Sequence, residues 1–481
     1  MAASTRVPHL SVDERRAKGK EARDRTPPSS HAGWTPASDR PDPVGLLEEQ
    51  NRTREPDLVP VRHGRMLVSP FTFYRGGAKI MAADLAGTPT AGLQVQLCGD
   101  AHLSNFGAFG SPERRLLFDL NDFDETLPGP FEYDVKRLAA SVTIAARNNG
   151  FSKADTRAAT LASVAAYREA MASFAAMGTL AIWYAHLDED QLLSGVQSAA
   201  AEASKASKKA AKAVKQVAKT ARKGAAKART RDSLQALAKL GERVDGQYRI
   251  VSQPPIVVPA RDLAATYGLS ADQMEGVVRE QFRAYRATLR DDQRQLLERF
   301  QFVDMARKVV GVGSVGTRAF IVLLQGRDQQ DPLFLQVKEA TRSVLEGHLR
   351  KSRYKQPGER VVRGQRMMQA ASDIFLGWTR GADVNRNYYW RQLRDMKASA
   401  EVEVMTPVGL ALYARTCGWT LARAHARSGD PVAIAAYLGE DDQFDRSMVD
   451  FAKRYADQNE LDYKAFADAI RSGRLEALEG Q

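Results

Sequence analysis

One β-rich stretch, residues 305–395, interrupts a chain whose other segments follow helical patterns. Short runs of β-branched and aromatic residues alternate in it with glycine-rich or polar turns, as in a small antiparallel sheet. The predicted strands cover residues 308–310, 319–324, 333–338, 374–378 and 388–390. Apolar residues elsewhere recur at helical spacing, and the main predicted helices cover residues 133–148, 153–176, 270–299, 357–371 and most of the chain after 406. The sequence therefore predicts an α+β fold that is mostly helical and has one small antiparallel β-rich lobe.

Composition limits the class of protein. Of 481 residues, 43% are hydrophobic, which is enough for a sizeable core and excludes wholesale disorder. The two cysteines, Cys98 and Cys417, belong to no CxxC pair, so neither a disulfide framework nor a structural zinc site is expected. No apolar run is long enough to span a membrane, and the first residues lead into charged sequence instead of an apolar segment. We therefore expect a cytoplasmic protein.

The net charge of +12 is concentrated in one segment of the chain. Residues 203–231 contain 11 Lys or Arg and no Asp or Glu. Their spacing places them on one broad face of an alanine-rich helix. Two interpretations remain open: the helix binds nucleic acid or another anionic surface, or its charged face is solvated while its alanines pack on the protein. The absence of interleaved aromatic residues, which would stack on bases, favours the second.

The densest group of polar residues follows a predicted strand at 93–97 and has the sequence GDAHLSN, with Asp100 and Asn105 as its main functional side chains. After a second short strand come Asp122 and Asp124. One carboxylate can orient or deprotonate an acceptor hydroxyl, while an Asn amide oxygen and further carboxylates are the hard ligands that Mg²⁺ prefers. The pattern predicts a phosphoryl-transfer site with Asp100 as the base and Asn105 and Asp122 on the metal. Asp124 either holds a second ion or braces the loop, and the competing interpretation is two polar turns that cap helices.

A glycine loop lies between two predicted strands at residues 311–316, GVGSVG. A dinucleotide-binding site would need a helix after the glycines, and a P-loop would need Gly-Lys-Ser/Thr, so neither motif is present. Strand, glycine loop, strand and a third strand with a lysine, here Lys338, is the order of a kinase small lobe. The loop residues expected to cover the phosphates of a nucleotide are Gly311, Gly313, Ser314 and Gly316.

Lys338 is the residue expected to pair with the nucleotide phosphates. Glu359 begins the next predicted helix and is the expected carboxylate partner of Lys338, with Glu346 as the alternative. The competing interpretation of the whole region is a tight hairpin with an exposed lysine.

These motifs resemble two groups of known proteins. The stretch from Gly99 to Asn105, followed by Asp122-Phe123-Asp124, resembles the catalytic and metal loops of aminoglycoside phosphotransferases and choline kinase-like proteins, with Cys98 where those usually have His. Asp134 resembles the acidic residue that those folds place shortly after the metal loop. Most of the chain from about residue 55 resembles a bacterial family catalogued as domain of unknown function 2252. The stretches that carry this second resemblance are 69–76, 98–105, 121–130, 311–316 and 421–430.

The resemblance implies a two-lobed protein kinase-like fold with its parts in inverted order. In ordinary kinases the glycine loop and the lysine precede the catalytic Asp, whereas here Gly311 and Lys338 come long after Asp100. We infer a circularly permuted fold, which chains tolerate where their termini meet at the surface. The resemblance also implies ATP and Mg²⁺ as cofactors.

The predicted function is a Mg²⁺- and ATP-dependent phosphotransferase that acts on an unknown small-molecule or protein hydroxyl. Nucleotidyl transfer would use the same residues. The alternative is a non-catalytic kinase-like scaffold that binds nucleotide, or that binds nucleic acid through the basic helix at 203–231.

Changes in composition along the chain divide it into five predicted parts. Residues 1–55 are rich in Pro, Ser, Asp and Arg and are expected to form a flexible tail. The other parts are a large-lobe catalytic segment (56–180), a helical insertion with the Lys/Ala-rich helix (181–300), a small nucleotide-binding lobe (301–396) and C-terminal helices that complete the large lobe (397–481).

Overall fold

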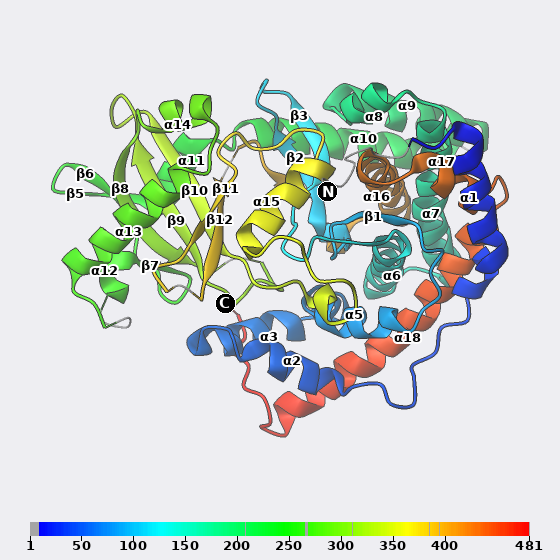
Figure 1. Cartoon of the computed structure of the whole chain (residues 1–481), viewed down its shortest axis with the longest axis horizontal. Helices are drawn as coiled ribbons and strands as arrows, with labels where there is room; N and C mark the ends of the chain where they lie inside the picture. Colours follow the sequence, from blue (N-terminus) through cyan, green and yellow to red (C-terminus); the bar gives the residue numbers. More distant parts are fainter. Residues whose placement is uncertain are drawn as a thin grey trace, which may run out of the picture.

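The computed structural model describes residues 9–206, 208–264, 268–309, 311–383, 385–393 and 395–480, without the side chains of residues 199–210, 271 and 275. The fold is α+β, mostly helical, with small antiparallel sheets, as the sequence predicts. One sheet and its covering helices occupy one side of the molecule, and a helical body occupies the other (Figure 1). No helix within the described ranges is long and apolar enough to cross a membrane.

The largest sheet is antiparallel and has the strand order β11-β12-β10-β9-β8-β7. Its strands are β7 (Val257–Pro259), β8 (Gln301–Lys308), β9 (Ala319–Gln325), β10 (Pro332–Glu339), β11 (Gly377–Arg380) and β12 (Asn387–Gln392). The sheet extends beyond the predicted stretch 305–395, because β7 pairs with β8 at its edge. On β10, Lys338 lies opposite Ala319 of β9 and Tyr389 of β12.

The two faces of this sheet have different surroundings, because neighbouring residues of a strand point to opposite faces. Leu335 and Val337 belong to the cluster covered by α13 (Ala271–Arg286) and α14 (Asp291–Leu297), the two pieces of the single predicted helix 270–299. Phe334 packs on the other face against α11 (Ser233–Leu240). Lys338 shares that second face, where the sheet meets the helical body.

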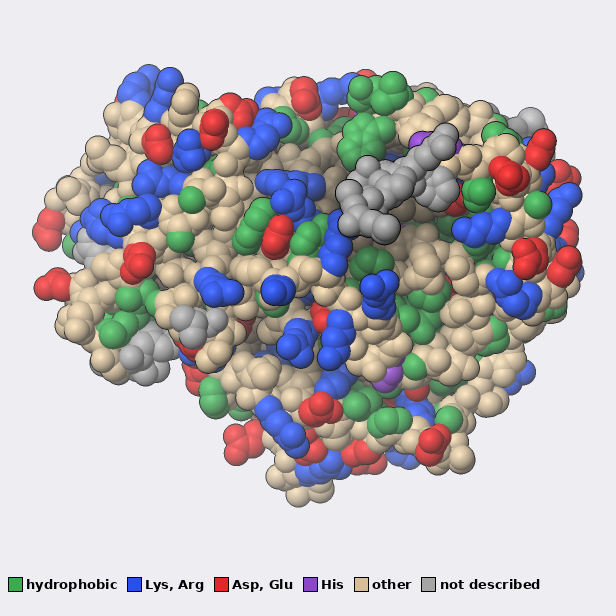
Figure 2. Space-filling model, viewed as in Figure 1, with side chains coloured by type: hydrophobic (Ala, Val, Ile, Leu, Met, Phe, Trp, Pro, Cys, Tyr) green, Lys and Arg blue, Asp and Glu red, His purple; other side chains and the backbone are tan. Residues whose placement is uncertain are grey.

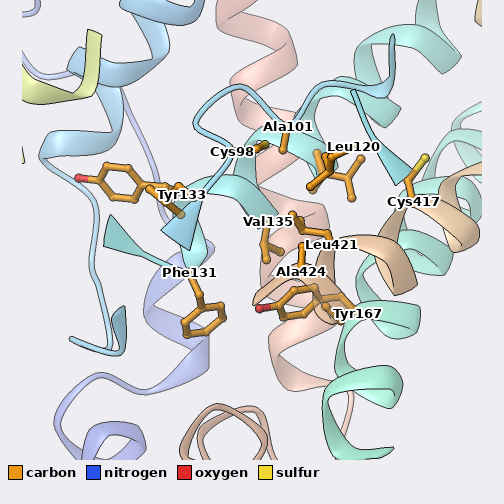
Figure 3. Close-up of a cluster of buried hydrophobic side chains, with 14 of the residues drawn as sticks. Cys98, Ala101, Leu120, Phe131, Tyr133, Val135, Tyr167, Cys417, Leu421 and Ala424 are labelled. Carbon is orange, nitrogen blue, oxygen red and sulfur yellow. The ribbon is translucent and has the colours of Figure 1, made fainter. Parts of the chain in front are cut away.

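The helical body is built around one almost fully buried helix, α6 (Glu132–Asn148). The helices around it are α7 (Lys153–Ala175), α16 (Pro407–Ser428), α17 (Pro431–Leu438) and α18 (Gln443–Arg471). Figure 3 shows part of this core, in which Phe131 stacks on Tyr167 with ring centroids 6.1 Å apart, beside Val135 and Leu421. Packing of this apolar surface supplies most of the stabilisation of the body.

Two small sheets place the polar loops of the sequence side by side. Strand β1 (Gln94–Leu97) pairs with β4 (Leu127–Pro130), and β2 (Phe106–Gly110) pairs with β3 (Leu116–Leu120) and with β13 (Ala398–Ser399). The loop from β1 to β2 contains Asp100 and Asn105, and the loop from β3 to β4 contains Asp122 and Asp124. Because β1 pairs with β4 and β2 pairs with β3, the loop from β1 to β2 lies beside the loop from β3 to β4.

The described part of the N-terminal segment is helical and packed, which differs from the predicted flexible tail over 1–55. Its helices are α1 (Val12–Arg25), α2 (Pro43–Asn51), α3 (Val59–Leu67), α4 (Pro70–Gly76) and α5 (Ala78–Ala86), with 3-10 turns at Pro28–His31 and Pro56–Leu58. Serine and Asp-Pro pairs, which suggest a loop, instead cap these helices: Ser11 forms a capping box, and Asp42 accepts from Val44 and Gly45. Arg23 of α1 donates to the carbonyl of Tyr437 at the end of α17.

The predicted basic helix is α10 (Lys208–Arg229), which follows α9 (Glu189–Ala206) and packs on it and on α16. Ala211, Val214 and Ala228 are buried, while Lys212 and Lys219 are exposed. This arrangement agrees with the interpretation in which the charged face is solvated and the alanines pack on the protein. Ser207 and the side chains of 199–210 lie outside the described residues. On the face drawn in Figure 2, basic and acidic side chains are interspersed.

The remaining elements are short or lie between the larger ones. They are α8 (Thr179–Tyr184), β5 (Gly241–Val244), β6 (Gln247–Ile250), α12 (Ala260–Leu263), α15 (Pro357–Met368) and 3-10 turns at Leu103–Asn105, Val344–Gly347 and Val402–Val404. Helix α15 contacts both β12 of the large sheet and α16 of the body.

Replacing Arg423 with Met is expected to destabilise the protein by about 3 to 5 kcal/mol, because a buried carboxylate would lose its cation. Arg423 of α16 pairs with Asp119 of β3, and both side chains are 1% exposed. The control is Arg415→Met on the same helix, where the exposed pair with Glu169 contributes about 0 to 1 kcal/mol. Urea unfolding measures both, and an equally small loss for the two variants would contradict the expectation.

Candidate active site

A cavity of about 740 Å³ lies where the large sheet meets the helical body. Four parts of the chain line it: the loop with Asp100, the loop with Asp122, the glycine loop, and the N-terminal helices with Arg54 and Arg75. Residues 339–348, which follow β10, complete the wall. Segments that are remote in sequence therefore meet around one space.

Most of the site residues predicted from the sequence meet at this cavity. Those that line it are Asp100, Asn105, Asp122, Asp124, Gly311, Gly313 and Ser314. Lys338 reaches it through the carboxylates of Asp122 and Asp124. Two predicted residues do not line it: the carbonyl of Gly316 accepts from the amide of Glu55, and Glu359 is bonded to Arg363.

Lys338 is bound between two carboxylates of the helical body. Its Nζ lies 2.6 Å from Oδ2 of Asp124 and 3.5 Å from Oδ2 of Asp122. Tyr389 donates from its hydroxyl to the other oxygen of Asp124 at 2.7 Å. Burial would lower the pKa of Lys338, but the two carboxylates outweigh burial and raise it. Burial would likewise raise the pKa of Asp124, and Lys338 holds it below its usual value.

The expected pairing of Lys338 with Glu359 or Glu346 is therefore wrong. Glu359 lies in the first turn of α15, where its amide is capped by Gln356 and its carboxylate faces Arg363 one turn further on. Glu346 closes a capping box with Ser343. Both carboxylates bond within their own helical turns. Lys338 of β10 instead binds the carboxylates of Asp122 and Asp124, in the loop between β3 and β4.

Asp100 is a half-buried carboxylate that one arginine contacts through two nitrogens. Nε and Nη2 of Arg137 each lie 2.7 Å from Oδ1 of Asp100. The guanidinium of Arg137 also stacks over the ring of Tyr74 at 3.8 Å. Burial raises the pKa of Asp100 to about 6, against the opposing effect of Arg137. The carboxyl group therefore titrates close to neutral pH, where a general base is most useful.

The loop that carries Asp100 is held from beneath by Asp134 of α6. The carboxylate of Asp134 accepts from the amides of Cys98 at 2.8 Å and Gly99 at 3.1 Å. Its Oδ2 also lies 3.2 Å from Nε2 of His425, whose other ring nitrogen contacts the hydroxyl of Tyr167. Gly99 has φ +85°, and a Cβ there would lie 2.2 Å from the carbonyl oxygen of Glu125. Only glycine allows the two loops to approach this closely.

Oxygen donors suited to Mg²⁺ gather beside Asp100. Nδ2 of Asn105 donates to the carbonyl of Asp100, which leaves the amide oxygen as an acceptor toward the cavity that Asp122 and Asp124 also line. Within the part of the chain that the structure describes, no group of three or more His, Cys, Asp or Glu is arranged to hold a metal ion. Two carboxylates and one amide oxygen nevertheless fit Mg²⁺, which usually takes few protein ligands and completes its shell with water and phosphate.

Sequence reasoning missed two residues that shape this site. Arg54 donates to the carbonyl of Val315 and so anchors the glycine loop to the N-terminal segment. The hydroxyl of Tyr389 donates to Asp124 and so orients it. The signal for Tyr389 was its place on the strand beside Lys338; no local signal points to Arg54.

The fold and the site together define a class: a mostly helical α+β protein with a charged cavity between a six-stranded antiparallel sheet and a helical body. The chain belongs to the family described as "Uncharacterized protein conserved in bacteria (DUF2252)", whose model matches residues 54–469. No curated protein and no solved structure matches the chain.

Proposed function

We propose that this protein is a Mg²⁺- and ATP-dependent phosphotransferase with a two-lobed, circularly permuted protein kinase-like fold. One observation carries the proposal: the glycine loop lines one cavity together with Asp100, Asn105 and Asp122, and Lys338 is paired with Asp122 and Asp124 at its wall. These groups are far apart in the sequence, so their meeting is a property of the fold. Positioning and charge stabilisation are the main requirements of phosphoryl transfer, and these groups supply both.

The order of elements supports a kinase-like arrangement. Strand β8, the glycine loop, β9, β10 with Lys338, then α15, follow the order of a kinase small lobe. The loops with Asp100 and Asp122 stand opposite, on the small sheets β1–β4 and β2–β3. Circular permutation follows in this proposal from the place of the small lobe after those loops in the chain.

Each residue has a role in the proposed transfer. The glycine-loop amides and Lys338 hold the nucleotide phosphates, and Asp134 keeps the loop of Asp100 in place. Mg²⁺, held by Asn105 and Asp122 with Asp124 beside them, would neutralise charge on the phosphates. A carboxylate oxygen of Asp100 takes the proton of the acceptor hydroxyl. At the same time the hydroxyl oxygen forms a bond to the γ-phosphorus. The bond from that phosphorus to the β–γ bridging oxygen breaks, and ADP leaves.

The reaction can be tested without knowing the acceptor. Purified protein is incubated with Mg²⁺, a bacterial metabolite extract and ATP labelled at either the α- or the γ-phosphorus. We expect label from the γ-position, and not from the α-position, on a new product. Transfer of the α-label would indicate nucleotidyl transfer instead, and the absence of both products would oppose an active enzyme.

Activity is expected to fall as the pH drops through about 6, because Asp100 is active only as a carboxylate. Arg137→Lys should shift this fall in activity to higher pH, because one of the two charge-assisted hydrogen bonds that favour the carboxylate of Asp100 is lost. The dependence of kcat/KM on pH measures both. The folded protein binds the Asp100 proton more tightly than the unfolded chain, so the contribution of Asp100 to stability declines as pH rises toward about 6. A kcat/KM that stays constant through this range would contradict Asp100 as the base.

A further inference from the structure

Arg75 is a largely buried arginine for which the described residues provide no hydrogen-bond or ion-pair partner. It lies in α4, and its side chain lines the cavity together with Asp100. Its Nε is buried without a hydrogen-bond partner, and no hydrogen bond or ion pair of its guanidinium occurs among the described residues. Burial lowers its pKa, and the charges of Glu403 and Asp100 oppose this shift without outweighing it.

Most acidic residues of the cavity have other partners, and Glu125 accepts from the amide of Val344. Asp100 pairs with Arg137, and Lys79 pairs with Glu49. Asp122 and Asp124 share Lys338. Buried charges in proteins are normally paired or hydrogen-bonded. Arg54, the other largely buried arginine of the cavity, donates to the carbonyl of Val315, whereas Arg75 has no such bond among the described residues. An anion supplied by a ligand would complete the pairing.

The position of Arg75 fits a ligand phosphate. A Cβ at Gly313 would lie 3.1 Å from the carbonyl oxygen of Arg75, so the tip of the glycine loop lies over the end of α4. On the other side, the charge of Arg75 contributes to the lowered pKa of His102, in the loop of Asp100. Arg75 therefore stands between the loop expected to cover the phosphates and the residue expected to act as base.

We propose that Arg75 binds a phosphate group in this cavity, next to Asp100. A guanidinium offers a planar fork that matches phosphate oxygens. The group is either the terminal phosphate of the nucleotide or a phosphate of the acceptor. Its part in transfer rests on the proposed function, whereas the phosphate site itself does not.

The site is tested with inorganic phosphate as the probe and the full chain. Equilibrium dialysis with labelled phosphate should show saturable binding that weakens about tenfold or more in Arg75→Gln. Arg75→Lys should bind with intermediate affinity, because it keeps the charge but loses the fork. The matched control is Arg52→Gln, an exposed arginine at the end of α2, which should bind as the wild type does. No internal hydrogen bond is lost with Arg75, so the variants are expected to fold, and circular dichroism checks this.

Nucleotide titrations separate the two sources of phosphate. If Arg75 binds the terminal phosphate of the nucleotide, Arg75→Gln weakens ATP binding about tenfold and leaves ADP binding unchanged. If it binds the acceptor, both nucleotides bind as in the wild type while phosphate binding falls. Phosphate binding that is equal in Arg75→Gln and the wild type, or absent in both, would overturn the inference. Failure of the proposed function has a different signature: wild-type protein that binds phosphate through Arg75 but does not bind MgATP.

Discussion

Replacing Asp100 with Asn is expected to lower the rate of phosphoryl transfer by about 10³-fold, the usual effect of removing a general base. The amide has nearly the same shape and can still accept a hydrogen bond from Arg137, but it cannot take the proton of the acceptor hydroxyl. ATP affinity should change little, since Asp100 faces the acceptor side of the reaction. Initial rates at saturating ATP measure the loss.

The matched control for this variant is Asp457→Asn, an exposed carboxylate of α18 that pairs with Arg147 far from the cavity. It should transfer phosphate at the wild-type rate. If Asp100→Asn were equally active, Asp100 would be a loop residue and not the base. A folded variant that loses both transfer and ATP binding would assign Asp100 to nucleotide binding instead.

Replacing Lys338 with Met is expected to weaken ATP binding more than tenfold and to destabilise the protein by about 3 kcal/mol. The side chain of Lys338 is 3% exposed and is the shared cation of Asp122 and Asp124. Without it, two neighbouring carboxylates repel each other in a partly buried site. ATP titration and urea unfolding measure the two effects separately.

The destabilisation should depend on pH in a specific direction. In the wild type Lys338 depresses the pKa of Asp124, so the stability from this pair is present at neutral pH and is lost as pH falls through that lowered pKa. In Lys338→Met the carboxylate of Asp124 protonates more easily, so the deficit relative to the wild type should shrink in acid. Lys351→Met, at an exposed lysine, is the control. A deficit that is the same at pH 7 and pH 4 would mean that the ion pairs contribute little.

The strands of the large sheet were predicted more accurately than its edge and its coverings. β9 and β10 are long, mostly apolar runs whose local pattern decides their structure. β7 has three residues and is a strand only because β8 lies beside it. Helix α1 was missed because its sequence is mostly charged, and burial of Gly19 and Ala22 at its contact with α17 stabilises it. Such tertiary contacts leave no periodic signal.

The candidate site was predictable as a set of motifs but not as one place. Each loop has its own residue pattern, whereas their meeting depends on the pairing of β1 with β4 and on the ion pair of Lys338 with Asp124. The partner of Lys338 was predicted wrongly for the same reason. Glu359 follows Lys338 more closely in the sequence, but the fold brings Asp122 and Asp124 to Lys338 instead. The role inferred for Arg75 likewise depends on its place in the fold, where its Nε is buried without a hydrogen-bond partner.

The most direct test of the central claim is calorimetric titration of the full chain with ATP in the presence of Mg²⁺. We predict one ATP per chain at sub-millimolar affinity, weakened about tenfold or more by EDTA or by Asp122→Ala. The Asp122 variant should remain folded, since the partly exposed Asp122 is the more distant of the two carboxylates bound to Lys338. Folded wild-type protein that does not bind MgATP at millimolar concentration would contradict the assignment as a phosphotransferase.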